Sequence, residues 1–114
     1  MKRTRMKHRP RRGDRPDLRD EYRQAHDRCG LCGVRGDRWT ALDLHHILGG
    51  RFGRKDHPAN MLILCRPCHE RMNGRQGVAL SLGAKARMGE LDLGALNAII
   101  ASHGTTYRLP EPTL

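Results

Sequence analysis

Two pairs of cysteines have the spacing of a metal-binding turn. Cys29 and Cys32 form the first C-x-x-C pair and Cys65 and Cys68 form the second, which accounts for all 4 cysteines of the chain. A C-x-x-C turn places two sulfurs on one side of a tight loop, and two such turns supply the soft ligands of a tetrahedral zinc ion. The set predicts one closed structural zinc site, with disulfides or reduced thiols as the alternatives.

Two consecutive histidines lie between the cysteine pairs. His45 and His46 belong to the segment 39–48, WTALDLHHIL, whose apolar residues predict a β-strand. Adjacent residues on a strand point to opposite faces, so the two rings should have different partners and different roles. The alternative is that both are ordinary strand histidines with no functional ligand.

A third histidine directly follows the second cysteine pair. His69 comes after Cys68 in a short helix expected over residues 67–73, where consecutive side chains diverge by about 100°. Cys68 can therefore face the zinc while His69 faces away, and Asn73 shares the face of His69. A strand histidine with His69 and Asn73 would make a partial shell with open positions, which suits a catalytic divalent ion. A polar surface histidine beside a zinc knuckle is the alternative.

The charge of the chain favours a polyanionic partner. Lys and Arg number 22 against 12 Asp and Glu, which gives a formal net charge of +10. Such a field attracts nucleic acid. An anionic membrane surface would call for a basic amphipathic helix with bulky apolar anchors, which we do not find in the sequence, so no membrane partner is expected. Charge that serves solubility alone is the remaining alternative.

The size and composition predict one small domain with a thin core. The chain has 114 residues with 1 Phe, 1 Trp and 2 Tyr, so a zinc staple would support the fold. We find no secretory signal and no stretch that is long and apolar enough to span a membrane. A cytoplasmic, reducing location is therefore expected, and it favours zinc over disulfides.

The local patterns predict an α+β order of elements. A disordered basic arm is expected over 1–13, a short helix capped by Asp17 within 14–28, and a C-terminal helical extension over 75–114. The central region, 29–74, would hold the strand 39–48, a glycine-rich loop 49–60, a second strand 61–65 and the helix 67–73. Within the extension, helices are expected over 78–89 and from an Asp92 cap to about Ser102.

The central region resembles the HNH endonucleases that carry a four-cysteine zinc site. The residues that carry the resemblance are Cys29-Gly-Leu-Cys32, Leu42-Asp-Leu-His-His-Ile47, Gly49-Gly50, Asn60-Met-Leu-Ile-Leu-Cys65 and Arg66-Pro-Cys-His69. The resemblance implies a zinc-stapled ββα-metal core with flanking helices.

The resemblance also implies roles for individual side chains. His45 would be the first metal ligand and His46 the general base. Asn60 would bridge the loop and orient the base, and His69 would be a further metal ligand. Asn73 stands where some members of the family have another histidine ligand.

The activity implied by the resemblance is metal-dependent hydrolysis of DNA phosphodiester bonds. Zn²⁺ would be structural, and Mg²⁺ or another divalent ion would be catalytic. Basic side chains of the arm and the loop would grip the phosphates of double-stranded DNA: Arg3, Arg5, Lys7, Arg9, Arg11, Arg12, Arg51, Arg54 and Lys55. The implied setting is a bacterial or phage-infected cell, with phage packaging or recombination proteins as candidate partners.

Two other classes of function fit parts of the sequence. A zinc-stabilised nucleic-acid-binding module without catalysis would use the cysteines and the charge, but it would leave His46, Asn60 and His69 without a role. A structural or interaction protein would use the C-terminal helices, for which the sequence offers no specific support. Mg²⁺-dependent nicking of plasmid DNA separates the endonuclease from both.

Overall fold

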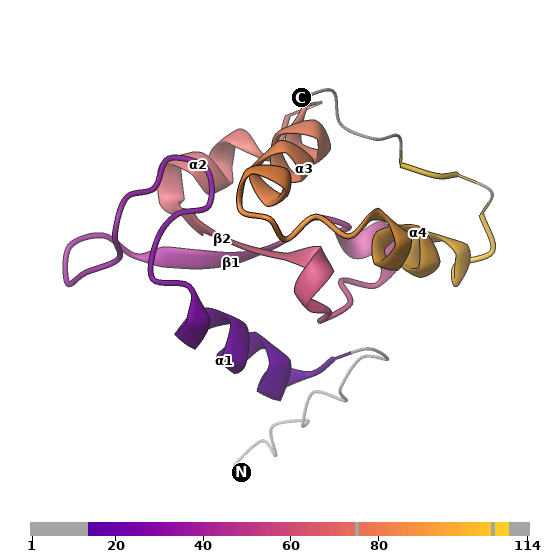
Figure 1. Cartoon of the computed structure of the whole chain (residues 1–114), viewed down its shortest axis with the longest axis horizontal. Coiled ribbons are helices and arrows are strands. Elements are labelled where there is room, and N and C mark those ends of the chain that lie inside the picture. The colour runs from indigo at the N-terminus through magenta and orange to yellow at the C-terminus, as the bar shows by residue number, and fades with distance from the viewer. Residues whose placement is uncertain (1–13, 75, 106, 110–114) are drawn as a thin grey trace, which may run out of the picture.

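A two-stranded antiparallel sheet lies between helices in the computed structural model, which describes residues 14–74, 76–105 and 107–109 (Figure 1). The sheet pairs β1 (Leu42–His46) with β2 (Met61–Cys65), and the register places His46 opposite Met61. The helices are α1 (Pro16–Ala25), α2 (Arg66–Arg71), α3 (Gly77–Arg87) and α4 (Leu93–Ala101), with the 3-10 turns η1 (Gly50–Phe52) and η2 (Pro58–Asn60) in the loop between the strands. The expected α+β class is confirmed.

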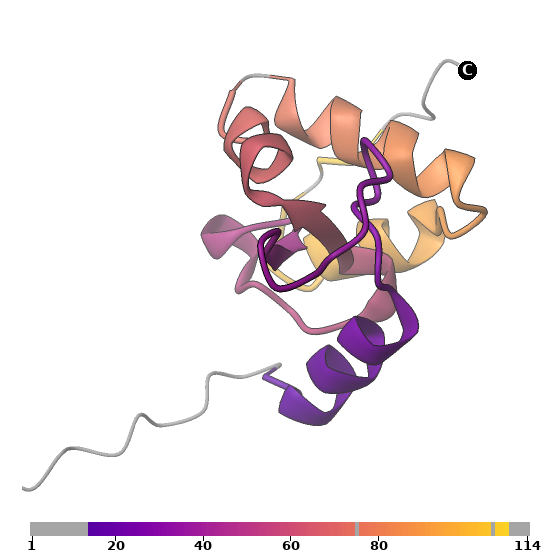
Figure 2. The ribbon, with the colours of Figure 1, turned by 90° about the vertical axis from the view of Figure 1, so that its left-hand side faces the viewer.

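The sheet separates two layers of helices. Figures 1 and 2 show α1 on one side of the sheet and α2 with α3 on the other. Leu42 and Leu44 pack with Tyr22 of α1, whereas Leu62 and Leu64 join the cluster that contains Met72 and Ala84. Every residue of β2 is buried, because apolar side chains of this strand face both layers. The alternation confirms that neighbouring residues of β1 face different layers.

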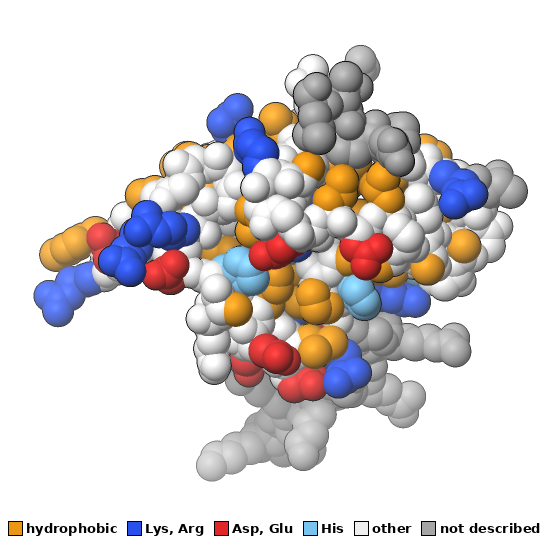
Figure 3. All heavy atoms as spheres, in the orientation of Figure 1, with side chains coloured by type: hydrophobic (Ala, Val, Ile, Leu, Met, Phe, Trp, Pro, Cys, Tyr) orange, Lys and Arg blue, Asp and Glu red, His pale blue; other side chains and the backbone are white. Residues whose placement is uncertain are grey.

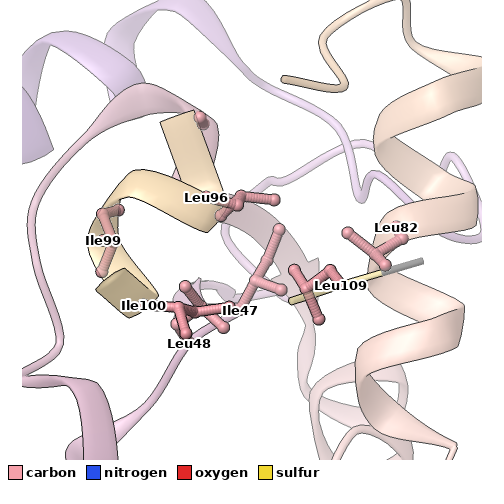
Figure 4. Close-up of a cluster of buried hydrophobic side chains, with 8 residues drawn as sticks. Ile47, Leu48, Leu82, Leu96, Ile99, Ile100 and Leu109 are labelled. Atoms are coloured by element: carbon pink, nitrogen blue, oxygen red, sulfur yellow. The ribbon is translucent and has the colours of Figure 1, made fainter. Parts of the chain in front are cut away.

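A third apolar cluster ties the C-terminal helices to the end of β1. Leu96, Ile99 and Ile100 of α4 surround Ile47 and Leu48, with Leu82 and Leu109 beside them (Figure 4). Ile47 and Leu48 are the residues that follow β1 directly. The extension therefore anchors the start of the 49–60 loop, on which Asp56 and Asn60 lie.

Several element boundaries differ from those expected. β1 begins at Leu42 rather than at residue 39, because a turn at Asp37–Thr40 precedes it and leaves Trp39 exposed. The N-cap of α1 is Arg15, and Asp17 lies in the first turn after Pro16, so the expected Asp17 cap is wrong.

The two helices of the extension agree more closely with expectation. α4 begins where predicted, with the Asp92 carboxylate accepting a hydrogen bond from the Ala95 N–H at 3.0 Å. α3 spans Gly77–Arg87 and thus starts one residue before the expected range. None of the helices within the described residues is long and apolar enough to span a bilayer. The arm 1–13 lies outside the described residues.

Candidate zinc site and candidate active site

The four cysteines come together as the sequence predicts. Their sulfur atoms all lie within 4.8 Å of one another, and the Sγ atoms of Cys32 and Cys65 are 3.7 Å apart. A tetrahedral shell with Zn–S bonds of about 2.3 Å has sulfur–sulfur edges of about 3.8 Å, so this spacing fits zinc. A disulfide would need about 2.0 Å, and the four thiols are free. The cluster can hold a structural zinc ion.

Backbone hydrogen bonds prepare the first knuckle for metal. The N–H groups of Leu31 and Cys32 both donate to the Cys29 Sγ at 3.4 Å. Burial raises the pKa of Cys29, but the backbone donors outweigh it and bring the pKa to about 6. Burial and the neighbouring sulfurs raise the pKa of Cys68 to about 12. A divalent ion would relieve the crowding of thiolates that opposes this last ionisation.

His45 and His69 meet on the α2 side of the sheet, as expected. Their ring centroids are 5.2 Å apart, with the planes at 66°. Burial, together with the nearby His69 and His46, lowers the pKa of His45 to about 4. Neutral imidazole is the form that binds a metal, so His45 is ready to act as a ligand at neutral pH.

Asp43 joins this histidine pair, and the sequence analysis did not assign it a role. Its Oδ2 lies 3.1 Å from His69 Nδ1 and accepts a hydrogen bond from Arg66 Nε at 2.8 Å. These hydrogen bonds, from His69 first and Arg66 second, hold the pKa of Asp43 below its usual value. Asp43 lies two residues before His45, so it is on the same face of β1, a periodicity that could have identified it.

The histidine pair is less closed than the cysteine site. In the part of the chain that the structure describes, the cysteines are the only group of three or more His, Cys, Asp and Glu ligands with mutual distances within 4.8 Å. His45, His69 and Asp43 do not form such a group, although the rings of His45 and His69 are neighbours and Asp43 is hydrogen-bonded to His69.

His46 points to the other layer, where its partner is a buried carboxylate. Its Nε2 lies 2.7 Å from Asp56 Oδ1, and the side chain of Asp56 is 0% exposed. The second oxygen of Asp56 accepts from Arg19 Nη1 at 2.6 Å and from the Arg15 N–H at 2.8 Å. The Asp56 carboxylate thus connects the candidate base to the N-terminal end of α1. No local sequence pattern indicates this contact, because Asp56 and Arg19 are 37 residues apart.

Asn60 braces the loop between the strands. Its Oδ1 accepts from the Leu48 N–H at 2.7 Å, and its Nδ2 donates to the carbonyls of Leu48 at 3.2 Å and Lys55 at 2.9 Å. Asn60 is 0% exposed, so these bonds lie in the interior. The expected bridge across the loop is present, while the contact with the His46 ring comes from Asp56 instead.

Asn73 lies in an exposed turn beyond the end of α2. The expected continuation of the helix to residue 73 is wrong, because α2 ends at Arg71 and Met72 is its C-cap. Asn73 therefore does not occupy a helical position four residues after His69.

The basic residues of the loop are distributed around η1. Arg51 and Arg54 are exposed, and Lys55 Nζ donates to Ser102 Oγ at 3.1 Å. Six expected DNA contacts lie outside the described residues: Arg3, Arg5, Lys7, Arg9, Arg11 and Arg12.

A cleft of about 500 Å³ opens beside β1 next to the histidine pair. Its lining includes Arg23 of α1 and Arg66 of α2, together with Asp43, His69 and Glu70. The cleft thus presents two cations and two carboxylates beside a candidate metal ligand, and Arg66 is paired with Asp43.

A family model matches the segment of the chain in which these sites lie. No curated protein and no solved structure matches the chain. Residues 29–75 match the family model described as HNH endonuclease, a segment that contains the cysteine cluster, the sheet and α2. Residues 29–75 are therefore similar to the HNH endonucleases, and they contain a cluster of four cysteines that could hold a metal ion.

Proposed function

We propose that the protein is a metal-dependent DNA endonuclease that hydrolyses phosphodiester bonds. The observation that supports the proposal is that the two histidines at the end of β1 have different partners. The ring of His45 contacts the ring of His69 on one face, and His46 is hydrogen-bonded to Asp56 on the other. In-line attack of water on a phosphate needs metal ligands and an oriented base, and the adjacent residues His45 and His46 offer one candidate for each.

His46 is the proposed general base. With Nε2 hydrogen-bonded to the Asp56 carboxylate, the ring carries its proton on Nε2 and keeps the lone pair on Nδ1. Nδ1 then takes the proton from the attacking water, and Asp56 stabilises the imidazolium that forms. The ion pair with Arg19 fixes the position of the Asp56 carboxylate.

His45 and His69 are the proposed ligands of the catalytic divalent ion, with Mg²⁺ as the first candidate. When bound, the ion would supply stabilisation of the charge that develops on the phosphate and on the leaving 3′ oxygen. A hydrogen bond from His69 Nδ1 to Asp43 would leave the lone pair of His69 Nε2 available to the ion. Asn60 keeps the loop closed around the site.

DNA is the proposed substrate, held by phosphate contacts. Arg23 and Arg66 lie along the cleft, and Arg51, Arg54 and Lys55 lie in the loop. The arm residues add further cations: Arg3, Arg5, Lys7, Arg9, Arg11 and Arg12. Contacts of this kind position a duplex without reading its bases, so we expect low sequence specificity.

Plasmid nicking tests the proposal. Wild-type protein should convert supercoiled plasmid to open circle in the presence of Mg²⁺ or Mn²⁺, and His46→Ala should be slower by roughly 10²–10⁴-fold. His103→Ala, a histidine outside both sites, is the matched control and should cut at the wild-type rate. Binding of DNA without metal-dependent cutting would instead support a zinc-stabilised binding module.

A further inference from the structure

Trp39 is an exposed aromatic side chain with no role in the proposed chemistry. It is the single Trp of the chain, and it is 86% exposed. Trp is highly buried on average in folded proteins, so an exposed fraction of 86% is unusual for this residue type. The apolar clusters of the described residues do not include it.

The turn that carries Trp39 is held in one shape by hydrogen bonds. Asp37 Oδ1 accepts from the N–H groups of Trp39 and Thr40, each at 2.8 Å, and the Asp37 N–H donates to the Thr40 carbonyl at 3.1 Å. This Asx-type turn closes the loop before β1 without help from the indole. The loop protrudes from the body of the molecule at the start of β1 (Figure 1). The hydrogen bonds of the turn thus fix the backbone from which the exposed indole extends.

Arginines surround the turn. Arg28, Arg35 and Arg38 are exposed, and Arg28 pairs with Arg35 in an isolated β-bridge. Arg35 also forms an exposed ion pair with Asp27 at 3.2 Å. Figure 3 shows hydrophobic side chains beside Lys and Arg side chains at the protruding end of the molecule. An aromatic platform among cations is the surface that binds nucleic acid by stacking and charge together.

Two clefts that share lining residues lie between the base of this turn and His69. A second cleft, of about 530 Å³, is lined by Asp37 and Thr40 at the base of the turn. It shares Arg23 and Leu42 with the cleft that contains His69. A single strand of nucleic acid that occupied both clefts would extend from His69 to the turn and would contact Arg23, which lines both clefts.

We propose that Trp39 stacks on an unpaired base of the DNA substrate, so that the enzyme prefers DNA with a bulge, a flap or a single-strand boundary. The inference rests on the proposed endonuclease function. In a perfect duplex each interior base is already covered on both faces, whereas an unpaired base offers a free face to the indole.

The spacing along the chain limits where the unpaired base lies. Trp39 precedes His45 by six residues, which span at most about 20 Å at roughly 3.3 Å per residue. This length corresponds to about six nucleotides at roughly 3.4 Å per base step. Cleavage should therefore fall within about six nucleotides of the unpaired base.

The fluorescence of the single Trp tests the proposal directly. Binding is measured with His46→Ala protein on a perfect duplex and on the same duplex with one unpaired base. The bulged duplex should quench the emission of Trp39 and should bind roughly 5- to 100-fold more tightly, the usual value of stacking on one base. Trp39→Ala should bind both DNAs equally, Trp39→Phe should recover the preference in part, and Tyr107→Ala, another exposed aromatic residue, should keep it.

The outcomes separate the inference from the proposed function. Equal affinity for the two DNAs, equal quenching by the perfect duplex, or a preference that survives in Trp39→Ala would overturn the role of Trp39. Metal-dependent nicking by wild-type protein would then leave the endonuclease proposal standing. Absence of both DNA binding and nicking would overturn the two together.

Discussion

His46 and Asp56 form a hydrogen bond of 2.7 Å between Nε2 and Oδ1 across the loop that separates the two strands. The carboxylate is fully buried, and its other oxygen accepts from Arg19 at 2.6 Å. Arg19 lies on α1, outside the residues 29–75 that match the family model. A helix that precedes the HNH domain therefore contacts the residue that orients its candidate base.

Replacing Asp56 by Asn should slow the reaction without preventing metal binding. The amide NH₂ would donate to His46 Nε2, which forces the ring proton onto Nδ1 and removes the lone pair that accepts the proton from water. We expect kcat to fall by roughly 10²–10⁴-fold, with KM and zinc content close to wild type. Single-turnover cleavage measures the effect, and Asp20→Asn on the exposed side of α1 is the control. Wild-type kcat in Asp56→Asn would exclude a positioning role.

Asp43→Asn should weaken the catalytic metal rather than the base. Asp43 accepts a hydrogen bond at His69 Nδ1, and loss of such a partner commonly costs a metal site about 10–100-fold in affinity or activity. We expect the Mg²⁺ concentration for half-maximal cleavage to rise by roughly this factor, with activity recovered at high metal. Titration of Mg²⁺ measures the shift. A lower plateau with an unchanged midpoint would show that Asp43 acts on another step.

Cys65→Ser should unfold the domain. Cys65 ends β2 and lies 3.7 Å from Cys32, so its loss opens the cluster at the junction of the sheet with α2. A structural zinc ion contributes on the order of 10 kcal/mol, which is comparable to the whole stability of a small domain. Metal analysis of wild-type protein should find about one zinc per chain. Circular dichroism of the variant should show loss of structure, and a folded protein without zinc would contradict the assignment.

A network of hydrogen bonds around the buried Lys85 links α1 to the C-terminal extension. Lys85 is 0% exposed, and its Nζ donates to Glu90 at 2.9 Å, to the Pro58 carbonyl at 2.8 Å and to Tyr22 Oη at 3.1 Å. Burial raises the pKa of Glu90, but hydrogen bonds from His26 and Lys85 bring it to about 2. Burial lowers the pKa of Lys85. The network holds α1 against the same loop that carries Asp56.

Glu90→Gln should destabilise the protein in a pH-dependent way. Because the folded pKa lies below the unfolded value of 4.5, ionised Glu90 stabilises the fold above pH 4.5, and this contribution disappears as the pH falls toward 2. The contribution is at most about 3 kcal/mol, reduced by the partial exposure of the carboxylate. Urea unfolding with excess zinc should show a difference in the free energy of unfolding between wild type and Glu90→Gln at pH 7. This difference should be smaller by about 1 kcal/mol at pH 4. Glu21→Gln, an exposed acid on α1, should show no such trend.

The elements were predictable where the pattern is local. The run MLILC marked β2 to the residue, and Asp92 marked the start of α4, because apolar runs and helix caps act over a few neighbouring residues. Trp39 was assigned to a strand by its type, whereas the Asp37 turn overrides that preference and leaves it exposed. Short-range hydrogen bonds of this kind compete with strand propensity.

The candidate site was predictable in part for the same reason. Alternation on a strand was enough to separate His45 from His46, and the cysteine spacing was enough to predict that the four cysteines cluster. Asp56 and Lys85 were missed because their partners are far along the chain: Asp56 pairs with Arg19 across 37 residues and Lys85 with Tyr22 across 63. Charged residues in a basic chain are ordinarily solvated, so burial of these two follows only from the packed structure.

Deleting residues 1–12 should weaken DNA binding without slowing the chemistry. The segment contains seven Lys and Arg and no acid. Each phosphate that these side chains neutralise releases counterions and contributes about −0.9 to the slope of log affinity against log salt. The deletion should therefore flatten the slope by several units, equally for all duplex sequences, because backbone contacts do not discriminate between bases. The rate at saturating DNA should survive, since His45, His46 and His69 are untouched. Salt titrations in the His46→Ala background compare the two chains. Parallel slopes would assign the phosphate contacts to Arg51, Arg54 and Lys55 of the loop and to Arg23 and Arg66 of the cleft.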